Sequence, residues 1–268
     1  MAEQTTERHI DGQITTERRG HILLIGIDRP EKYNGFTPKM FTELAEAYAQ
    51  LENAGDAWVG VLFAHGKHFT AGLDLPKFAG AMRESQPILP TNGIDPFALG
   101  EPFRTKPVIS AVKGICFTAG IELMLATEVV IAAEDTRFSQ LEVGRGVMAA
   151  AGATVRMVER AGWGNAMKVL LTGCEFDAAQ ALHCNFIQEV VAPGQELIRA
   201  IEVAEEIARQ APLAVRETMR NCRKSLLQGP QAAIGDYIAV MQSLANTEDA
   251  REGVQSFIDK RPPRYRGR

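Results

Sequence analysis

Two glutamates lie in apolar sequence surroundings that suit a carboxyl group to proton transfer. Glu122 stands in the segment AGIELML, and Glu142 stands in the segment SQLEVG. A carboxyl group that loses contact with water has a raised pKa, which lets it give up or accept a proton near neutral pH. Each glutamate taken alone is equally well explained as a helix cap or as an exposed residue. The pair indicates catalysis only together with other functional groups nearby.

Two loops with small residues supply backbone N–H groups near these glutamates in the sequence. Residues 66–75 (GKHFTAGLDL) directly follow an apolar stretch that predicts a buried strand, and residues 113–123 (KGICFTAGIEL) lead from another such stretch into a helix. The first amides of a helix lack partners and carry the positive end of its dipole. Because the ends of parallel strands meet at one edge of a sheet, the loops can together form an oxyanion hole, a pair of N–H donors that stabilises a developing negative charge. A simple strand-to-helix turn explains either loop taken alone.

The elements that must position these residues alternate between strand and helix through about residue 140. An apolar run at residues 21–27 predicts a buried strand, paired as a hairpin with residues 14–18. Thr37-Pro38 suits the start of a helix, and apolar residues at three- and four-residue steps continue it to residues 53–55. Further strands are predicted at residues 58–64, 107–112 and 128–133, with a helix start at residues 120–127. This order of strand, helix and strand indicates a parallel sheet with right-handed crossovers.

The remainder of the chain is predicted to be mainly helical. The expected helices cover residues 165–172, 177–182, 195–211, 212–227 and 230–245, and one short strand is expected at residues 186–191. Residues 76–106 are rich in proline and are the least regular part. We expect this stretch to be either a disordered insertion or a functional lid.

Length and composition predict the number of domains and the cellular compartment of the protein. The 268 residues suffice for one large α/β domain, or for one domain with a small helical appendage. The hydrophobic fraction of 46% and the net charge of −4 are typical of a globular protein that does not bind nucleic acid. The cysteines form no CxxC pair, no apolar run approaches the roughly 20 residues of a membrane span, and the polar N-terminus lacks a secretory core. We therefore expect a cytoplasmic protein without nucleic-acid or membrane partners.

Several motifs, in one order, resemble those of the crotonase (enoyl-CoA hydratase/isomerase) superfamily. They are AGLDL at residues 71–75, the G-x5-G-x-EL segment at residues 114–123, and FSQLE-x-G at residues 138–144. The segments DRPEKYNGF, near the N-terminus, and KRPPRYRG, near the C-terminus, extend the similarity over nearly the whole chain. The resemblance implies an α/β fold of the ClpP/crotonase-like type. Its expected parts are a flexible segment at residues 1–13, a β-β-α spiral core at 14–200 and a C-terminal helical trimerisation region at 201–268.

The same resemblance implies roles for the two glutamates and for three amides. In the hydratases of the superfamily, the glutamate matching Glu122 helps to activate a water for attack at Cβ, and the one matching Glu142 delivers a proton to Cα. The oxyanion hole that polarises the thioester carbonyl maps onto the amides of Ala71 and Ala119, and the amide of Ala150 would help to hold the water. The implied protein is an enoyl-CoA hydratase that forms a 3-hydroxyacyl-CoA. Coenzyme A is then part of the substrate, and no cofactor is tightly bound.

Other residues are assigned to the substrate by the resemblance. Met82 and Phe97 match the lining of the acyl pocket. The remaining expected contacts of the substrate or of its CoA part are Lys32, Tyr33, Gly35, Gly72, Leu73, Asp74, Leu75 and Gly120. A turn also explains the segment around Tyr33, and Asp74 is also explained as the cap of the next helix. No metal site is expected, because the histidines at positions 65, 68 and 183 lack the spacing of metal ligands.

Two alternative functions stay open. Isomerases of the superfamily commonly keep only the glutamate matching Glu142, so the pair favours hydration, but a Δ3-Δ2 enoyl-CoA isomerase or another acyl-CoA enzyme remains possible. Residues 149–153 (AAAGA) stand where the superfamily usually has P-G-x-G-G, and alanine restricts φ more than glycine does. A catalytically silent acyl-CoA-binding protein is therefore the second alternative. The resemblance also implies a homotrimer or a hexamer built as a dimer of trimers.

Overall fold

Two β-sheets form the core of the computed structural model, which describes residues 9–83 and 93–268, without the side chains of residues 81–83. The larger sheet has the strand order β1-β2-β3-β4-β6-β9, and the smaller one has the order β5-β7-β8. The strands of the larger sheet are β1 (Gln13–Arg19), β2 (Ile22–Asp28), β3 (Val59–Ala64), β4 (Val108–Val112), β6 (Val129–Ala133) and β9 (Glu189–Val191). Those of the smaller sheet are β5 (Ile115–Phe117), β7 (Arg137–Ser139) and β8 (Phe176–Asp177).

The larger sheet follows the predicted order of pairing. β1 and β2 form the expected antiparallel hairpin, and every further neighbour from β2 to β9 is parallel. Each residue of β2 is buried, as its continuous apolar run predicts. The smaller sheet was not predicted, because its strands have three residues or fewer and so show no period. It receives β5 directly after β4 and β7 directly after β6, which produces the β-β-α spiral that the resemblance implies.

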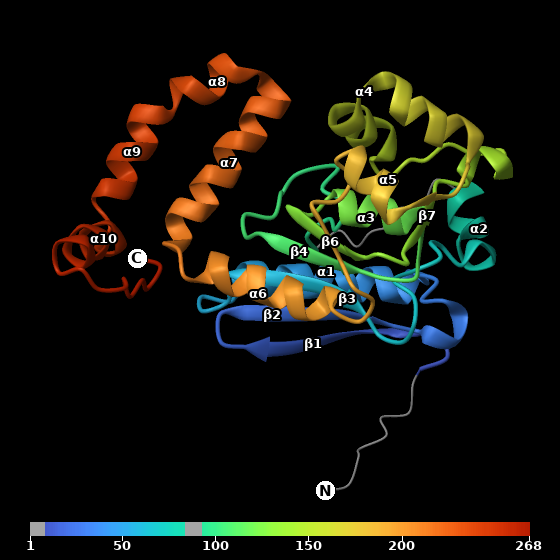
Figure 1. Ribbon diagram of the computed structural model, residues 1–268, viewed down its shortest axis with the longest axis horizontal. Coiled ribbons are helices and arrows are strands. Elements are labelled where there is room, and N and C mark those ends of the chain that lie inside the picture. Colours follow the sequence, from blue (N-terminus) through green and yellow to red (C-terminus); the bar gives the residue numbers. More distant parts are fainter. Residues whose placement is uncertain (1–8, 84–92) are drawn as a thin grey trace, which may run out of the picture.

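The helices of the core lie around these sheets (Figure 1). Helix α1 (Pro38–Asn53) begins as predicted, with the Thr37 hydroxyl accepting the amide of Met40. Helix α2 (Leu75–Arg83) lies inside the stretch that we expected to be irregular. The other helical elements are η1 (Pro30–Lys32), α3 (Ala119–Leu125), η2 (Glu142–Arg145), α4 (Ala153–Thr172), α5 (Ala178–His183) and α6 (Glu196–Ala208). Position 200, the predicted end of the core, falls inside α6, which contacts β3, β4 and β6.

The last four helices form an arm that extends away from the sheets (Figure 1). They are α7 (Pro212–Gln228), α8 (Pro230–Gly235), α9 (Tyr237–Ala245) and α10 (Glu248–Ile258). The single helix predicted at residues 230–245 is thus interrupted at Asp236, and α10 was not predicted. The C-terminal segment folds back on α10, where the Asp249 carboxylate accepts the amides of Arg266 and Gly267. It also reaches the core, because the Tyr265 ring packs on the cluster that contains Trp58.

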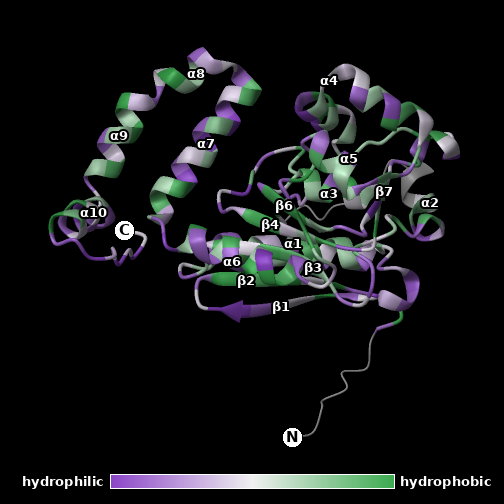
Figure 2. Ribbon diagram, viewed as in Figure 1, coloured by the Kyte–Doolittle hydropathy of each residue, from purple (hydrophilic) through white to green (hydrophobic). Residues whose placement is uncertain are grey.

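Many apolar side chains on the arm face solvent in the single chain. The ribbon of the arm in Figure 2 alternates between green apolar segments and purple polar ones. The most exposed are Leu226, Leu227, Ile238, Met241, Val254, Phe257 and Ile258. Large contiguous apolar surfaces are uncommon on monomers and mark sites of association. Among the residues described, no helix combines the length and apolar character that crossing a membrane requires.

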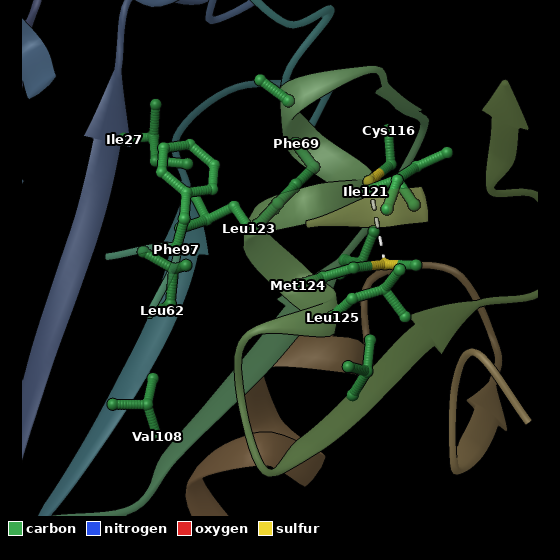
Figure 3. Packing of buried hydrophobic residues seen from close by; sticks show 14 of the residues in the cluster. Ile27, Leu62, Phe69, Phe97, Val108, Cys116, Ile121, Leu123, Met124 and Leu125 are labelled. Atoms are coloured by element: carbon green, nitrogen blue, oxygen red, sulfur yellow. Dashed lines mark hydrogen bonds between the residues drawn. The ribbon is translucent and has the colours of Figure 1, made fainter. Parts of the chain in front are cut away.

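Helix α3 is fixed from all sides by the main hydrophobic core. All seven of its residues are buried. Figure 3 shows Ile121, Leu123, Met124 and Leu125 of this helix packed among side chains from the strands and loops around them. Such close packing leaves a side chain little freedom to move. A functional group carried by α3 is therefore held rigidly by apolar contacts.

Candidate active site

The loops that follow β3 and β4 lie against each other. The amide of Thr70 donates to the carbonyl of Ile115 (3.1 Å), and the amide of Phe117 donates to the carbonyl of Thr70 (3.0 Å). Glycine is required where the loops touch, because a Cβ on Gly72 would lie 1.8 Å from Thr118 Oγ1. Likewise a Cβ on Gly120 would lie 2.6 Å from the Thr70 methyl carbon. The structure thus joins the two segments that the sequence singled out.

One of the two amides predicted for the oxyanion hole is already engaged. The Ala71 N–H donates to the carbonyl of Tyr33 at 2.9 Å, so it is not free to bind a substrate oxygen, and this part of the prediction is wrong. The Ala119 N–H begins α3 and has no acceptor among the described residues. The second amide without an acceptor among the described residues is that of Leu73. Leu73 forms an isolated parallel β-bridge with Phe36. In this bridge the Gly72 carbonyl accepts the Phe36 amide, and the Asp74 amide donates to the Phe36 carbonyl. The Leu73 N–H therefore points away from Phe36.

Glu122 is buried, with 3% of its surface exposed. Its Oε1 accepts the amides of Ala151 (2.7 Å) and Ala153 (3.1 Å) at the start of α4. Burial raises the pKa of Glu122, while the two amides and the positive charge of Arg156 act in the opposite direction. The carboxylate is therefore held in one orientation by N–H groups that favour its ionised form.

The alanine-rich run holds Glu122 through two of its amides and leaves the amide predicted to hold the water, that of Ala150, without an acceptor in the described chain. The two donors to the carboxylate are Ala151 and Ala153, whereas Ala150 is exposed. Within residues 149–153 the left-handed φ of +110° falls on Gly152. The alanines around it have no positive φ. The replacement of glycines by alanines therefore places no strain on this helix start.

Glu142 begins η2, immediately beyond the smaller sheet, and it is half-buried. Gln140 Nε2 donates to Glu142 Oε1 at 3.1 Å, and Oε2 is buried without a partner among the described residues. Burial, together with the nearby charge of Glu122, raises the pKa of Glu142 to about 7, although hydrogen bonds from its own backbone amide and from Gln140 oppose the rise. The sequence did not single out Gln140, since a glutamine two residues before a glutamate carries no distinctive signal.

The two carboxyl groups thus differ in environment although they are close enough for one charge to affect the other. Glu122 accepts two N–H groups, whereas Glu142 has an oxygen without a donor. A pair of carboxyls in different environments can supply one base and one acid. Free amides at the same junction can stabilise an oxyanion. The arrangement is suited to moving protons at a carbon next to a carbonyl group.

Several residues assigned to the CoA part of a substrate are exposed, and Tyr33 lies beside the loop after β3, because its carbonyl accepts the Ala71 amide. Tyr33 is 54% exposed and stacks on the His68 ring with 5.1 Å between ring centroids. Lys32 is exposed beside it, and the Gly35 amide donates to the Lys32 carbonyl. Leu75, at the start of α2, is 44% exposed. Their contacts with CoA stay a prediction.

Two further assignments change or fall outside the described residues. The Asp74 carboxylate pairs with the buried guanidinium of Arg29 (2.8 Å) and does not cap α2 with its side chain. Phe97 is buried in the main core, where its ring lies edge-on to Phe41. The side chain of Met82 lies outside the described residues. In the described part of the chain, no three His, Cys, Asp or Glu side chains are grouped so as to hold a metal ion.

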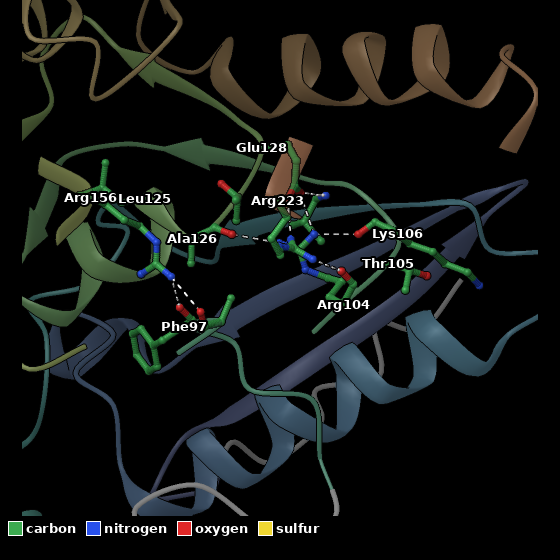
Figure 4. A network of polar contacts seen from close by, with 12 residues as sticks. Phe97, Arg104, Thr105, Lys106, Leu125, Ala126, Glu128, Arg156 and Arg223 are labelled. Atoms are coloured by element: carbon green, nitrogen blue, oxygen red, sulfur yellow. Dashed lines mark hydrogen bonds and ion pairs between the residues drawn. The ribbon is translucent and has the colours of Figure 1, made fainter. Parts of the chain in front are cut away.

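Glu128, the first residue of the strand predicted at residues 128–133, is part of a buried polar network (Figure 4). Its Oε2 accepts Arg104 Nη1 (2.6 Å) and the amide of Val108 (2.7 Å). Arg104 is 2% exposed and also donates to the carbonyls of Lys106 and Ala126. Glu128 is therefore the counter-ion of a buried arginine at the base of β4.

Replacing Glu128 by Ala is expected to lower the free energy of unfolding by roughly 3–5 kcal/mol, because a buried guanidinium loses its counter-ion. Urea unfolding followed by circular dichroism measures the change. Glu175→Ala is the control, since Glu175 pairs with Arg137 through side chains that are 47% and 58% exposed. That surface pair contributes about 0–1 kcal/mol. Equal losses in the two variants would contradict the role of Glu128.

The fold and the paired carboxyls define a class of α/β enzymes, and comparison with known proteins identifies the family. The profile of the family described as "Enoyl-CoA hydratase/isomerase" matches residues 17–268. The chain therefore belongs to the enoyl-CoA hydratase/isomerase family of the crotonase superfamily, as its motifs indicate.

Relatives match along nearly their full length. The chain is 30% identical to mevalonyl-coenzyme A hydratase sidH of Aspergillus fumigatus, with 98% of each chain covered. It is 30% identical to 2,3-dehydroadipyl-CoA hydratase of Escherichia coli, with 96% of this chain and 99% of the relative covered. The crystal structure of a probable enoyl-CoA hydratase/isomerase from Mycobacterium abscessus is similar with a TM-score of 0.92 and 41% identity, covering 95% and 98% of the two chains. These neighbours confirm the crotonase fold.

Proposed function

We propose that the protein catalyses the reversible addition of water to a 2-enoyl-CoA thioester, giving a 3-hydroxyacyl-CoA. The observation that carries this proposal is the pair of unequal carboxyls at the junction of the two loops. Glu122 is held by two amides, and Glu142 has a pKa of about 7 and one oxygen without a donor. Hydration needs a base for water and an acid for the enolate, and this pair supplies both.

The proposed step balances with these two groups. The Glu122 carboxylate accepts a proton from water while the water oxygen bonds to Cβ. The electrons of the double bond move to the thioester oxygen, which the N–H groups of Leu73 and Ala119 stabilise. Protonated Glu142 then gives its proton to Cα and restores the carbonyl. Glu122 ends protonated and Glu142 ends ionised, so exchange with solvent resets the pair.

The CoA part of the substrate is proposed to lie along the rim formed by Lys32, Tyr33, Gly35 and the segment at residues 72–75. The exposed ring of Tyr33 offers a surface for an adenine base. The chemistry needs no cofactor apart from the CoA of the substrate itself. The relatives named above are hydratases of different CoA esters, which supports a hydration reaction without specifying the acyl group.

Incubation with crotonyl-CoA in 18O-labelled water tests the proposal. We expect a 3-hydroxybutyryl-CoA that carries the label on its hydroxyl oxygen, because that oxygen comes from water. Conversion of a 3-enoyl-CoA to a 2-enoyl-CoA without uptake of label would instead indicate an isomerase. Tight binding of acyl-CoA without turnover of enoyl-CoAs of graded length would indicate a silent binding protein.

The arm is proposed to assemble the chain into a trimer or a dimer of trimers through its exposed apolar side chains. Light scattering coupled to size exclusion measures the mass. Met241→Asp should dissociate the assembly, because Met241 is 70% exposed in the single chain and an assembly would bury it. Gln242→Asp, an exposed neighbour on the same helix, is the matched control. A monomeric wild-type protein at micromolar concentration would refute this part of the proposal.

A further inference from the structure

Arg156 joins three parts of the chain close to Glu122. It lies in the first turn of α4, and its Nη2 donates to the carbonyls of Phe97 (2.6 Å) and Ala98 (3.0 Å). Its Nη1 donates to the carbonyl of Ala151 at 3.4 Å. Figure 4 shows the guanidinium turned toward the backbone at Phe97. One cation therefore ties the 95–99 turn to the start of α4.

Ala151 carries this contact directly to Glu122. Its carbonyl accepts Arg156, and its amide donates to the carboxylate of Glu122 at 2.7 Å. The guanidinium also lies against the next residue, because a Cβ on Gly152 would be 2.0 Å from Arg156 Nη1. A side chain at position 152 would therefore require the guanidinium to move. The position of the amide that holds Glu122 therefore depends on where the guanidinium lies.

The turn on the other side of Arg156 is rigid. The Asp95 carboxylate accepts the amides of Phe97 (2.8 Å) and Leu99 (2.7 Å), and Ala98 has a φ of +48°. The Phe97 ring is anchored in the main core against Phe41, with 5.6 Å between ring centroids. The carbonyls of the turn thus have fixed positions, and the guanidinium that binds them is fixed in turn.

We propose that Arg156 is a positioning residue that couples the 95–99 turn to Glu122, orienting that carboxylate and placing a positive charge near it. The proposal rests on the proposed function for the role of Glu122 as the base. A guanidinium suits this task better than an ammonium, because its planar set of donors can bind several carbonyls at once. Lysine has one nitrogen and cannot reach all three carbonyls in the same geometry.

The charges around the two groups give the expected sign of the pH effect. Burial raises the pKa of Glu122, the charge of Arg156 opposes that rise, and Glu142 is the other titrating carboxyl of the site. Arg156 itself faces Asp95 and Glu159, which favour its charged form, and Arg223, which opposes it. Removing the positive charge therefore raises the pKa of Glu122. Since the base must be ionised, the acid limb of kcat/KM should move to higher pH.

Three variants test the proposal. Arg156→Gln should lower kcat/KM for crotonyl-CoA by at least about tenfold and move the acid limb upward. Arg156→Lys should lower kcat while leaving the limb near its wild-type position, because the charge remains. Arg160→Gln is the matched control, since Arg160 lies on the same helix and donates to the carbonyls of Leu125 and Phe186 but not to Ala151 or the 95–99 turn. It should not move the limb.

A direct titration of Glu122 tests this proposal independently of the proposed function. Infrared difference spectroscopy in a Glu142→Gln background follows the protonated carboxyl band of Glu122 without turnover. We expect a higher pKa of Glu122 after Arg156→Gln, and an unchanged pKa would overturn the proposal even if activity falls. If the wild-type protein hydrates no enoyl-CoA, the proposed function is refuted. The titration of Glu122 still shows whether Arg156 controls that carboxyl group. If Arg156→Gln does not fold, Arg156→Lys decides, and unchanged kcat in that variant would refute the proposal.

Discussion

Replacing Glu142 by Gln is expected to lower kcat for crotonyl-CoA hydration by about a hundredfold or more, the usual contribution of a positioned proton donor. Glutamine is close in shape but cannot deliver a proton to Cα. In the wild-type enzyme the alkaline limb of kcat/KM should fall near pH 7, because the proton donor loses its proton there. Stopped assays at several pH values measure both effects. Glu134→Gln, on an exposed loop residue, is the control, and near-wild-type turnover by Glu142→Gln would refute the assigned role.

The same substitution should stabilise the fold at alkaline pH. The pKa of Glu142 rises from an ordinary 4.5 to about 7 in the folded protein, so the folded state binds this proton more tightly than the unfolded chain does. Ionising Glu142 therefore lowers the free energy of unfolding. This loss is absent below pH 4.5, grows as the pH rises and is complete above pH 7. Removing it should add up to about 3 kcal/mol at pH 8 and little at pH 4. A variant that is inactive yet more stable at pH 8 separates loss of a proton donor from loss of structure.

Replacing Gly72 by Ala is expected to destabilise the protein by about 3 kcal/mol, from backbone strain and overpacking together. Gly72 has a φ of +98°, and the added Cβ would lie 1.8 Å from Thr118 Oγ1. The displacement would also move the Leu73 amide, so kcat should fall as well. Chemical unfolding and crotonyl-CoA assays measure the two effects.

A second substitution tests the origin of that loss. Thr118→Gly removes the hydroxyl and the Cβ that face Gly72, so the double variant should regain the part of the stability lost to the clash. Gly55→Ala is the control, because a Cβ there meets nothing within 4 Å. If Gly72→Ala proved as stable as Gly55→Ala, the close contact of the two loops would be refuted.

The sequence predicts the larger sheet and the neighbourhood of the two glutamates because both follow from local pattern and topology. Long apolar runs specify strands, and consecutive parallel strands place their following loops at one edge. The identity of the free amide does not follow in this way. Ala71 and Leu73 lie two residues apart in one loop, and the choice between them depends on hydrogen bonds to Tyr33 and Phe36, more than 30 residues away.

Residues that act through distant contacts carry no sequence signal of their own. Arg156 is one polar residue on a helix, and its partners at Phe97 and Ala98 lie nearly 60 residues earlier in the chain. Glu128 could face a pocket or pair with Arg104, and only the packing of β4 beside β6 decides between them. The three-residue strands of the smaller sheet are likewise set by their neighbours rather than by periodicity.

The return of the C-terminus to the core has a consequence for the kinetics of association. The arm begins at α7 and contacts the core again at Tyr265, so both of its ends are anchored to the core. Its apolar surface therefore has a defined shape before any partner arrives, and little chain entropy remains to be lost on contact. In the proposed trimer, the subunits would therefore associate as preformed bodies. Their encounter rate should accordingly depend on diffusion and orientation rather than on a folding step.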